Sequence, residues 1–401
     1  MRRRGVACVA AALAIGATLW PPAPAIAAPA KAECLPAAER IDDRVPWAQQ
    51  RLALDRAWEL SRGGGVTVAV VDTGVDARTP QLSGRVLRGH DMLVSGGAGN
   101  TDCFGHGTFV AGIIGAAPLT GAGFVGVAPD VRILPVRATD GQDGTAEAFA
   151  RGIVAAVDSG AKVINVSAST TSEDPRLVEA VRYAESRDVV VVAAVANGSA
   201  SPDSASPTVY PAALPTVLAV AAIDATGQRA SFSQPGHYID LAAPGADVTS
   251  VGPDGPGHLR GSGTSYAAPF VAGVAALVRA YRPGLTAAQV RHRLQVTADR
   301  PARVPDAGVG WGVVNPLAAL ATELPEEGAA SGAHAARPSA QPAAPPVVRH
   351  NGRLLVLLGA GATLAVIGLA GLLAVLGPAG HRRRWRPART LRVHPDREPW
   401  P

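Results

Sequence analysis

The stretch VTVAVVDTGVD at residues 66–76 decides the fold class. It is rich in Val and Ala up to Asp72 and lacks the strict polar–apolar alternation of a half-exposed strand. Continuous apolar runs of this kind are typical of strands buried on both faces, as in a parallel sheet covered by helices on each side. Similar runs recur at 131–138, 162–169, 189–197, 217–224 and 238–245. The sequence therefore predicts an α/β fold with a mostly parallel sheet.

Helices are expected before, between and after these strands. Their apolar spacing places them at 49–60, 109–115, 145–159, 177–186, 265–281 and 286–295. Pro269 should fall near the first turn of its helix, where a missing N–H costs least. In open α/β sheets, binding sites form beyond the carboxyl ends of the strands. Reactive side chains should therefore be sought at the junctions that follow the strands.

Composition and charge exclude several classes of protein. The 401-residue chain is 47% hydrophobic and 17% charged, which suits a folded domain with a large core and excludes a disordered chain. The net charge is +5, but basic residues gather at Arg2–Arg4 and after residue 380, while the body between them is mildly acidic. This placement indicates membrane topology and argues against a nucleic-acid partner.

Both ends of the chain carry segments related to membranes. Residues 1–27 combine a basic start, an apolar run and small residues, which predicts a secretory signal peptide; an uncleaved membrane anchor is the alternative. The uncharged run 354–376 predicts a transmembrane helix, because at ~1.5 Å per residue it can span a ~30 Å hydrocarbon core. A buried core helix is the alternative there. The span should anchor the protein in the cell membrane. The basic tail, 377–401, should then lie in the cytoplasm and the body of the chain outside it.

These segments divide the rest of the chain into three parts. Residues 28–60 form an N-terminal extension, and 61–324 form the main domain. Residues 325–350 are rich in Ala and Pro without apolar periodicity, which predicts a semi-extended linker to the membrane span. The extension is short, and we expect it to wrap the main domain.

Four side chains at strand ends and helix starts fit the chemistry of acyl transfer. Asp72 ends the first strand, His106 lies in DCFGHGT and Ser265 lies in GSGTSYAAP. A serine hydroxyl becomes a nucleophile when a histidine takes its proton, and an aspartate on the other ring nitrogen fixes the histidine tautomer. Asn197 ends another strand, and its amide could join the N–H of Ser265 as a donor to an oxyanion.

Each of these residues also has an ordinary structural interpretation. An Asp after a strand is often a turn residue, a Gly-flanked His is often structural, and Gly-Thr-Ser before a helix is usually an N-cap. Their occurrence together, in this order and at matching junctions, favours the catalytic interpretation.

The motifs DTGVD, GHGT and GTSYAAPFVAG resemble those of the subtilisin-like serine proteases, and the resemblance covers residues 47–320. It implies a three-layer subtilisin-like fold and hydrolysis of a protein or peptide substrate through an acyl-enzyme. It makes Ser265 the nucleophile and His106 the general acid and base. Asp72 then orients the histidine, and Asn197 donates to the oxyanion. We assign no cofactor and no metal site.

A narrower resemblance is to the mycosins, membrane-anchored proteases associated with type VII secretion systems of actinobacteria. It rests on the signal peptide, the WAQQRL leader, the Asp-Cys-x-Gly-His-Gly-Thr motif, the linker, the single span and the basic tail. The chain departs from mycosins by lacking two further cysteines and by carrying Val195-Ala196 in place of Ala-Gly before Asn197. The resemblance implies a membrane-anchored serine endopeptidase associated with a type VII secretion complex. A structural subunit with secondary catalysis and a general degradative surface protease are the alternatives.

Two further features of the sequence are its cysteines and a glycine-rich stretch. Cys8 leaves with the signal peptide, so Cys34 and Cys103 remain, and in an extracytoplasmic protein they are expected to form a disulfide; two free thiols are the alternative. GAGFVG at 121–126 matches a dinucleotide-binding pattern, but it precedes an expected strand and does not join a strand to a helix. No nucleotide site is expected.

Overall fold

The computed structural model describes residues 34–141, 144–198 and 207–328. Within these ranges seven parallel strands form one sheet in the order β2-β3-β1-β4-β5-β6-β7. The strands are β1 (Thr67–Asp72), β2 (His90–Asp91), β3 (Arg132–Arg137), β4 (Val163–Val166), β5 (Val190–Ala194), β6 (Val217–Ile223) and β7 (Leu241–Pro244). A separate antiparallel pair is formed by β8 (Val248–Val251) and β9 (His258–Gly261). The parallel sheet predicted from the apolar runs is confirmed.

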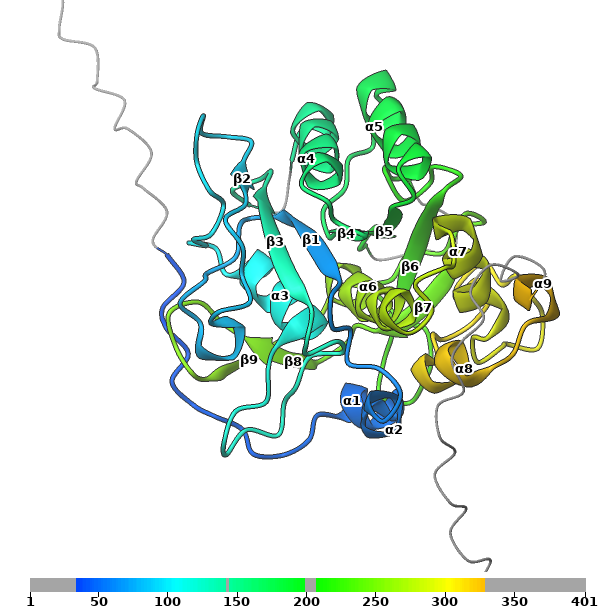
Figure 1. Cartoon of the computed structure of the whole chain (residues 1–401), viewed down its shortest axis with the longest axis horizontal. Helices are drawn as coiled ribbons and strands as arrows, with labels where there is room; N and C mark the ends of the chain where they lie inside the picture. Colours follow the sequence, from blue (N-terminus) through cyan, green and yellow to red (C-terminus); the bar gives the residue numbers. More distant parts are fainter. Residues whose placement is uncertain (1–33, 142–143, 199–206, 329–401) are drawn as a thin grey trace, which may run out of the picture. The chain divides into compact units, whose positions relative to one another are not determined.

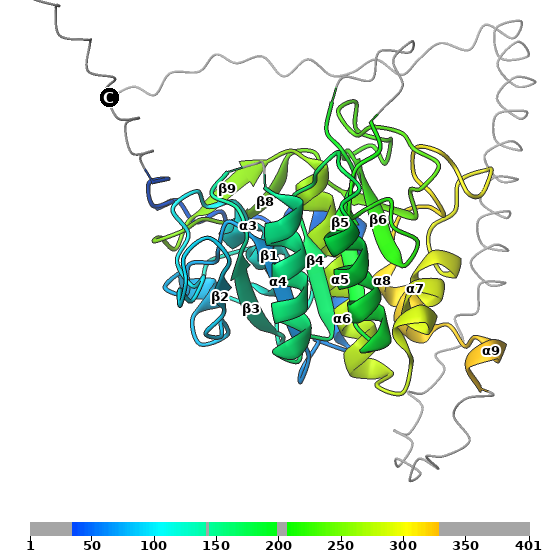
Figure 2. The same cartoon turned by 90° about the horizontal axis from the view of Figure 1, so that it is seen from above.

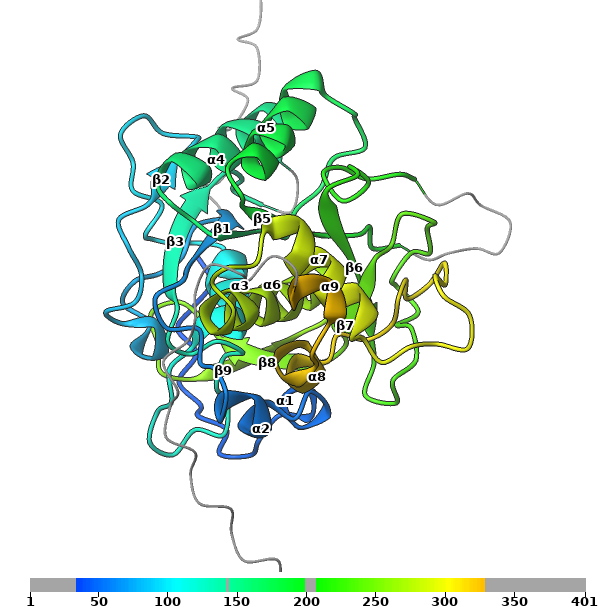
Figure 3. The ribbon, with the colours of Figure 1, turned by 45° about the vertical axis from the view of Figure 1, so that its right-hand side comes forward.

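Helices cover both faces of the sheet, as expected (Figure 1, Figure 2). One face carries α4 (Ala146–Asp158) and α5 (Pro175–Ser186), and the other carries α3 (His106–Gly115) and α6 (Thr264–Tyr281). Two further helices, α7 (Ala287–Val296) and α8 (Pro316–Ala321), flank α6 (Figure 3). The short elements are α1 (Trp47–Arg51), α2 (Leu54–Trp58), η1 (Pro80–Leu82) and α9 (Pro325–Gly328).

Strand β1 shows why its sequence lacks polar alternation. Val68 and Val70 point into the core shared with α3 and α6, whereas Ala69 and Val71 point into the core shared with α4 and α5. All four side chains are fully buried. Because successive strand residues face opposite sides of the sheet, two apolar layers require apolar residues at every position. This burial positions Asp72, the last residue of the strand.

The N-terminal region differs from the prediction. In place of one helix over 49–60, the structure has α1 and α2, separated by Ala53 in a left-handed conformation with φ 47°. Ala48, Leu52 and Leu54 are buried in the core that contains α3 and α6. Residues from α1 onward, which the sequence analysis assigned to the extension, therefore pack against the core of the domain.

Several other boundaries are corrected by the structure. The helix expected at 109–115 begins at His106, and the strand expected to end at Asn197 ends at Ala194. Pro269 lies in the second turn of α6, because that helix begins at Thr264. The pair β8–β9 was not predicted, and the GAGFVG loop runs from α3 toward β3, outside any strand–turn–helix unit.

The start of the predicted linker is folded. Residues 325–328 form α9, and the Glu327 carboxylate pairs with Arg293, whose side chain is 0% exposed. Arg293 also donates to the carbonyl oxygens of Ala319 and Thr322. A buried cation is retained at low cost only when it is paired and hydrogen-bonded, as it is here. Residues 325–328 therefore pack against the domain.

The other terminal predictions lie outside the described residues. These are the signal peptide at 1–27, the rest of the linker, the span at 354–376 and the tail at 377–401. In the part of the chain that the structure does describe, none of the helices has both the length and the apolar character needed to cross a bilayer.

Candidate active site

Asp72 ends β1 and has a side chain that is 1% exposed. Its Oδ1 accepts hydrogen bonds from the backbone N–H of Thr73 and from Nδ1 of His106, both at 2.7 Å. Its Oδ2 has no hydrogen-bond partner among the described residues. Among the described side chains, the imidazole of His106 is thus the one that donates to this buried carboxylate, and the bond holds Nδ1 in its protonated state.

His106 is the first residue of α3, and glycines on both sides allow its position. Gly105 precedes the helix with φ 79°, a left-handed conformation that glycine adopts without strain. At Gly107 a side chain would overlap the carbonyl oxygen of Gly74, in the loop that follows β1. These two glycines let the helix start pack against the end of β1, which brings His106 to Asp72.

A second buried carboxylate, Asp102, shapes the turn before His106. It accepts hydrogen bonds from the backbone N–H groups of Gly105 and Thr108, each at 2.8 Å, and from the hydroxyls of Thr108 and Thr73. Burial raises the pKa of Asp102, although these four hydrogen bonds oppose the shift. The sequence analysis did not single out this residue. Its signal was present, because an Asp side chain in a turn often accepts from backbone N–H groups a few residues later.

Nε2 of His106 lies 3.0 Å from Oγ of Ser265, so the imidazole bridges Ser265 and Asp72. Burial opposes the charged form of the imidazole, but the charge and hydrogen bond of Asp72 outweigh it and raise the pKa of His106. The ring of Tyr266 packs 5.1 Å from the imidazole. Burial and the charge of Asp72 raise the pKa of that tyrosine to about 12, so its hydroxyl stays neutral.

Ser265 occupies the first turn of α6, where backbone N–H groups have no acceptor within the helix. Asn197 lies three residues beyond β5 and reaches this helix start. Its Oδ1 accepts from the N–H of Thr264 at 2.9 Å and lies 3.0 Å from the Thr264 hydroxyl oxygen. Bonding at Oδ1 leaves both Nδ2 protons available to an incoming oxygen. The structure thus brings all four predicted residues together.

The four residues border a cavity of about 500 Å³. Apart from Asp72 and His106, the described side chains that line it are uncharged. Its walls come from the segments after β4 and β5, where the lining residues are Ser167, Ala168, Ser169, Thr170, Thr171, Val195 and Ala196. Such walls can accept a polypeptide chain without desolvating a further charge.

Comparison with known proteins identifies the family to which a chain with this geometry belongs. The sequence profile described as "Subtilase family" matches residues 63–312, which include all four residues. The chain belongs to the subtilase family. It is therefore a serine endopeptidase, and the subtilisin-like fold expected from its motifs is confirmed.

Mycosins are among the relatives of this subtilase. Mycosin-3 of Mycobacterium tuberculosis (strain ATCC 25618 / H37Rv) is 39% identical and covers 79% of the chain and 80% of its own length. A solved MycP3 protease from the type VII (ESX-3) secretion system is 38% identical with a TM-score of 0.65, over 73% of this chain and 93% of its own. A chain in the periplasmic assembly from the ESX-5 inner membrane complex is 35% identical with a TM-score of 0.66, over 80% and 93%.

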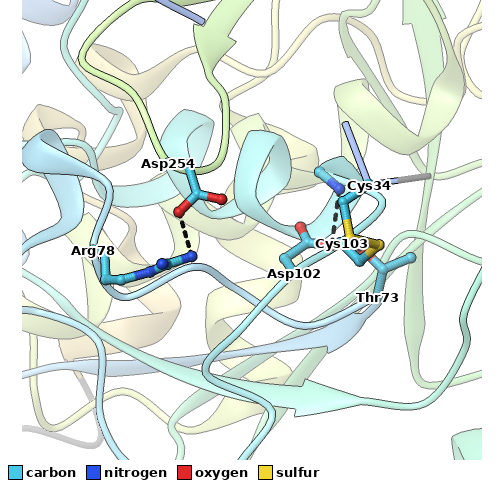
Figure 4. The surroundings of a disulfide bond; sticks show 7 residues. Cys34, Thr73, Arg78, Asp102, Cys103 and Asp254 are labelled. Atoms are coloured by element: carbon cyan, nitrogen blue, oxygen red, sulfur yellow. Dashed lines mark hydrogen bonds and ion pairs between the residues drawn. A yellow bond between two sulfur atoms is a disulfide. The ribbon is translucent and has the colours of Figure 1, made fainter. Parts of the chain in front are cut away.

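The N-terminal extension of this subtilase lies along the domain beside the active site. Cys34 and Cys103 are joined by a disulfide in the structure (Figure 4). The N–H of Leu35 donates to the carbonyl of Cys103. Further along, the N–H groups of Gly257 and His258 donate to the carbonyls of Ala38 and Arg40. The described part of the extension therefore wraps the domain, as expected.

Reduction of Cys34–Cys103 should release the extension before the sheet unfolds. The bridge spans 69 positions and adds up to ~4 kcal/mol in the chain-entropy treatment. Before α1 the extension has little burial in the core, so we expect its backbone hydrogen bonds to open first. Hydrogen exchange should show early loss of protection at Gly257 and His258, with β1 still protected. Peptide mapping that finds both thiols freely alkylated in the secreted protein would reject the bridge.

Proposed function

We propose that this subtilase hydrolyses peptide bonds through an acyl-enzyme formed on Ser265. The observation that carries the proposal is the imidazole of His106, which lies 2.7 Å from a carboxylate oxygen of Asp72 and 3.0 Å from the Ser265 hydroxyl. A neutral imidazole with Nδ1 protonated has its Nε2 lone pair directed at the hydroxyl proton. This is the arrangement that general-base activation of serine requires.

The reaction follows from these contacts. Nε2 of His106 takes the hydroxyl proton as Ser265 Oγ bonds to the substrate carbonyl carbon, and the carbonyl oxygen becomes an oxyanion. Nδ2 of Asn197 and the N–H of Ser265 donate to that oxyanion. The imidazolium then gives its proton to the leaving amine as the C–N bond breaks. Water, deprotonated by the same imidazole, then attacks the ester carbonyl carbon. The imidazolium returns that proton to Ser265 Oγ as the bond between Oγ and the acyl carbon breaks.

Asn197→Ala should lower kcat by ~10²–10³-fold, the scale measured for the corresponding donor of subtilisin. KM should change little, because this donor meets the oxyanion and not the ground-state carbonyl. Steady-state kinetics on a peptide substrate would measure both parameters. An increase in KM at unchanged kcat would instead place Asn197 in substrate binding.

The cellular setting is the second part of the proposal. We place the catalytic domain outside the cytoplasm, anchored by 354–376 and associated with a type VII secretion membrane complex. The predicted signal peptide, the apolar run and the basic tail support this placement. The likeness to a protease from the ESX-3 secretion system and to a chain of the ESX-5 periplasmic assembly supports the association with such a complex.

A protease added outside intact cells should release the catalytic domain by cutting within the predicted linker, 325–350. A C-terminal epitope on the tail should remain cell-associated and protected. Immunoblots against the domain and the epitope would measure both outcomes. Digestion of the tail epitope in intact cells would show that the predicted topology is wrong.

Deletion of the gene in the native host, followed by complementation, separates the proposed roles. If catalysis is the essential role, the wild-type chain should restore type VII secretion and Ser265→Ala should not. Full rescue by Ser265→Ala would favour the structural subunit, with catalysis secondary. Unimpaired secretion in the deletion strain, with loss of surface protein turnover, would favour the general degradative protease.

A further inference from the structure

The carbonyl oxygen of Ser265 lacks its helical partner. In an α-helix this oxygen would accept from the N–H four residues later, which is the position of Pro269. Proline has no N–H, and its ring crowds the carbonyl of the residue four positions earlier. The helix that carries Ser265 therefore has an open acceptor at that same residue.

Ser167 fills this open position from another element. It follows β4, and its hydroxyl lies 2.7 Å from the carbonyl oxygen of Ser265. The Nδ2 group of Asn165, a 0% exposed residue of β4, lies 2.7 Å from the same hydroxyl oxygen. Because an amide nitrogen only donates, Ser167 must accept from Asn165 and can direct its single proton to Ser265. Asn165 Oδ1 has no hydrogen-bond partner in the described ranges, so the amide is held by its bond to Ser167.

We propose that Ser167 is a positioning residue for Ser265, whose hydroxyl replaces the N–H that Pro269 lacks. The inference rests on the proposed role of Ser265 as nucleophile. The carbonyl and Oγ of Ser265 are both attached through its Cα, so holding the carbonyl restricts rotation of the residue. The hydrogen bond thereby keeps Oγ within 3.0 Å of His106.

The expected effect is on the chemical step. A displacement of about 1 Å between reacting groups can cost ~10²-fold in rate. Ser167→Ala should therefore lower kcat ~10–100-fold and leave KM within about threefold, because the lost contact is to the nucleophile and not to the substrate. A role confined to the cavity wall would instead raise KM.

A double variant gives the sharper test. Pro269→Ala restores an N–H opposite the Ser265 carbonyl. The carbonyl oxygen then has a hydrogen-bond donor even when the Ser167 hydroxyl is absent. In Ser167→Ala/Pro269→Ala, kcat should return to within about threefold of the Pro269→Ala value. Such recovery requires the two residues to act on one shared acceptor, and simple loss of packing would not produce it.

Ser61→Ala is the matched control. The Ser61 hydroxyl also donates to a carbonyl of α6, that of Leu277, but at the other end of the helix and away from the cavity. Its removal should lower thermal stability without changing kcat. Titration of each variant with a fluorophosphonate would count correctly folded sites, so that kcat refers to competent enzyme.

The proposal is overturned if Ser167→Ala keeps the wild-type kcat, or if the double variant shows no recovery. If Ser167→Ala does not fold, the double variant must still yield active enzyme, and its inactivity would overturn the proposal equally. Ser265→Ala distinguishes the two levels of inference. Activity retained in Ser265→Ala would remove the proposed nucleophile, whereas an inactive Ser265→Ala with an unaffected Ser167→Ala would reject the positioning role alone.

Discussion

Ser265→Ala and His106→Ala should each lower kcat by about 10⁶-fold, the scale measured for subtilisin, and the double variant should be scarcely slower than either. The two side chains act as one unit, since a serine without its base is as inert as a base without its serine. Residual turnover would come from the oxyanion donors and from binding. Active-site-normalised kinetics on a peptide substrate would measure the loss, with thermal unfolding as a control for folding.

Two results would contradict this expectation. If the losses multiplied in the double variant, the two residues would act independently, and the 3.0 Å contact between them would not be the catalytic one. If Ser265→Ala kept wild-type turnover, the nucleophile would be another residue.

Asp72→Asn should lower kcat by ~10⁴-fold, because an asparagine amide in place of the carboxylate favours the wrong histidine tautomer. It should also move the acidic limb of the pH profile. In the wild type Asp72 outweighs burial and raises the pKa of His106, and only the neutral imidazole can accept the serine proton. Activity should therefore fall as the pH drops through a value above the usual ~6.5 of histidine. Without the charge, the limb should shift to lower pH.

The same pKa shift has a consequence for stability. A folded-state pKa above the unfolded value means that the native state binds the proton more tightly. The resulting contribution to stability is fully present below the unfolded pKa of His106 and is lost as the pH rises through the folded one. In Asp72→Asn this pH dependence should weaken. An unchanged acidic limb and an unchanged stability profile would show that Asp72 does not set the protonation of His106.

The strand ends and helix starts around the site were the most predictable part of the molecule. Asp72 follows a strand whose every side chain is buried, and His106 and Ser265 lie in Gly-containing motifs that mark helix starts. Local sequence is sufficient for such features, because burial on both faces and glycine-dependent turns leave direct signatures. Asn197 was found as well, although β5 ends three residues earlier than expected.

The features that sequence analysis missed depend on long-range contacts. The left-handed Ala53 that separates α1 from α2 has no local signal, because alanine favours continuing the helix. The position of Pro269 in the second turn of α6 is tolerated next to a hydroxyl from a segment 98 residues away. Likewise, Glu327 looked like part of a polar linker until the structure placed it against Arg293.

Labelling with a fluorophosphonate tests the central claim most directly, because this reagent bonds to a serine only where a base activates it. Mass spectrometry of the labelled, digested protein should locate one adduct, on Ser265. The His106→Ala variant should not be labelled under the same conditions, although the serine is still present. An adduct on a different serine, or undiminished labelling of Ser265 in His106→Ala, would contradict the proposed triad.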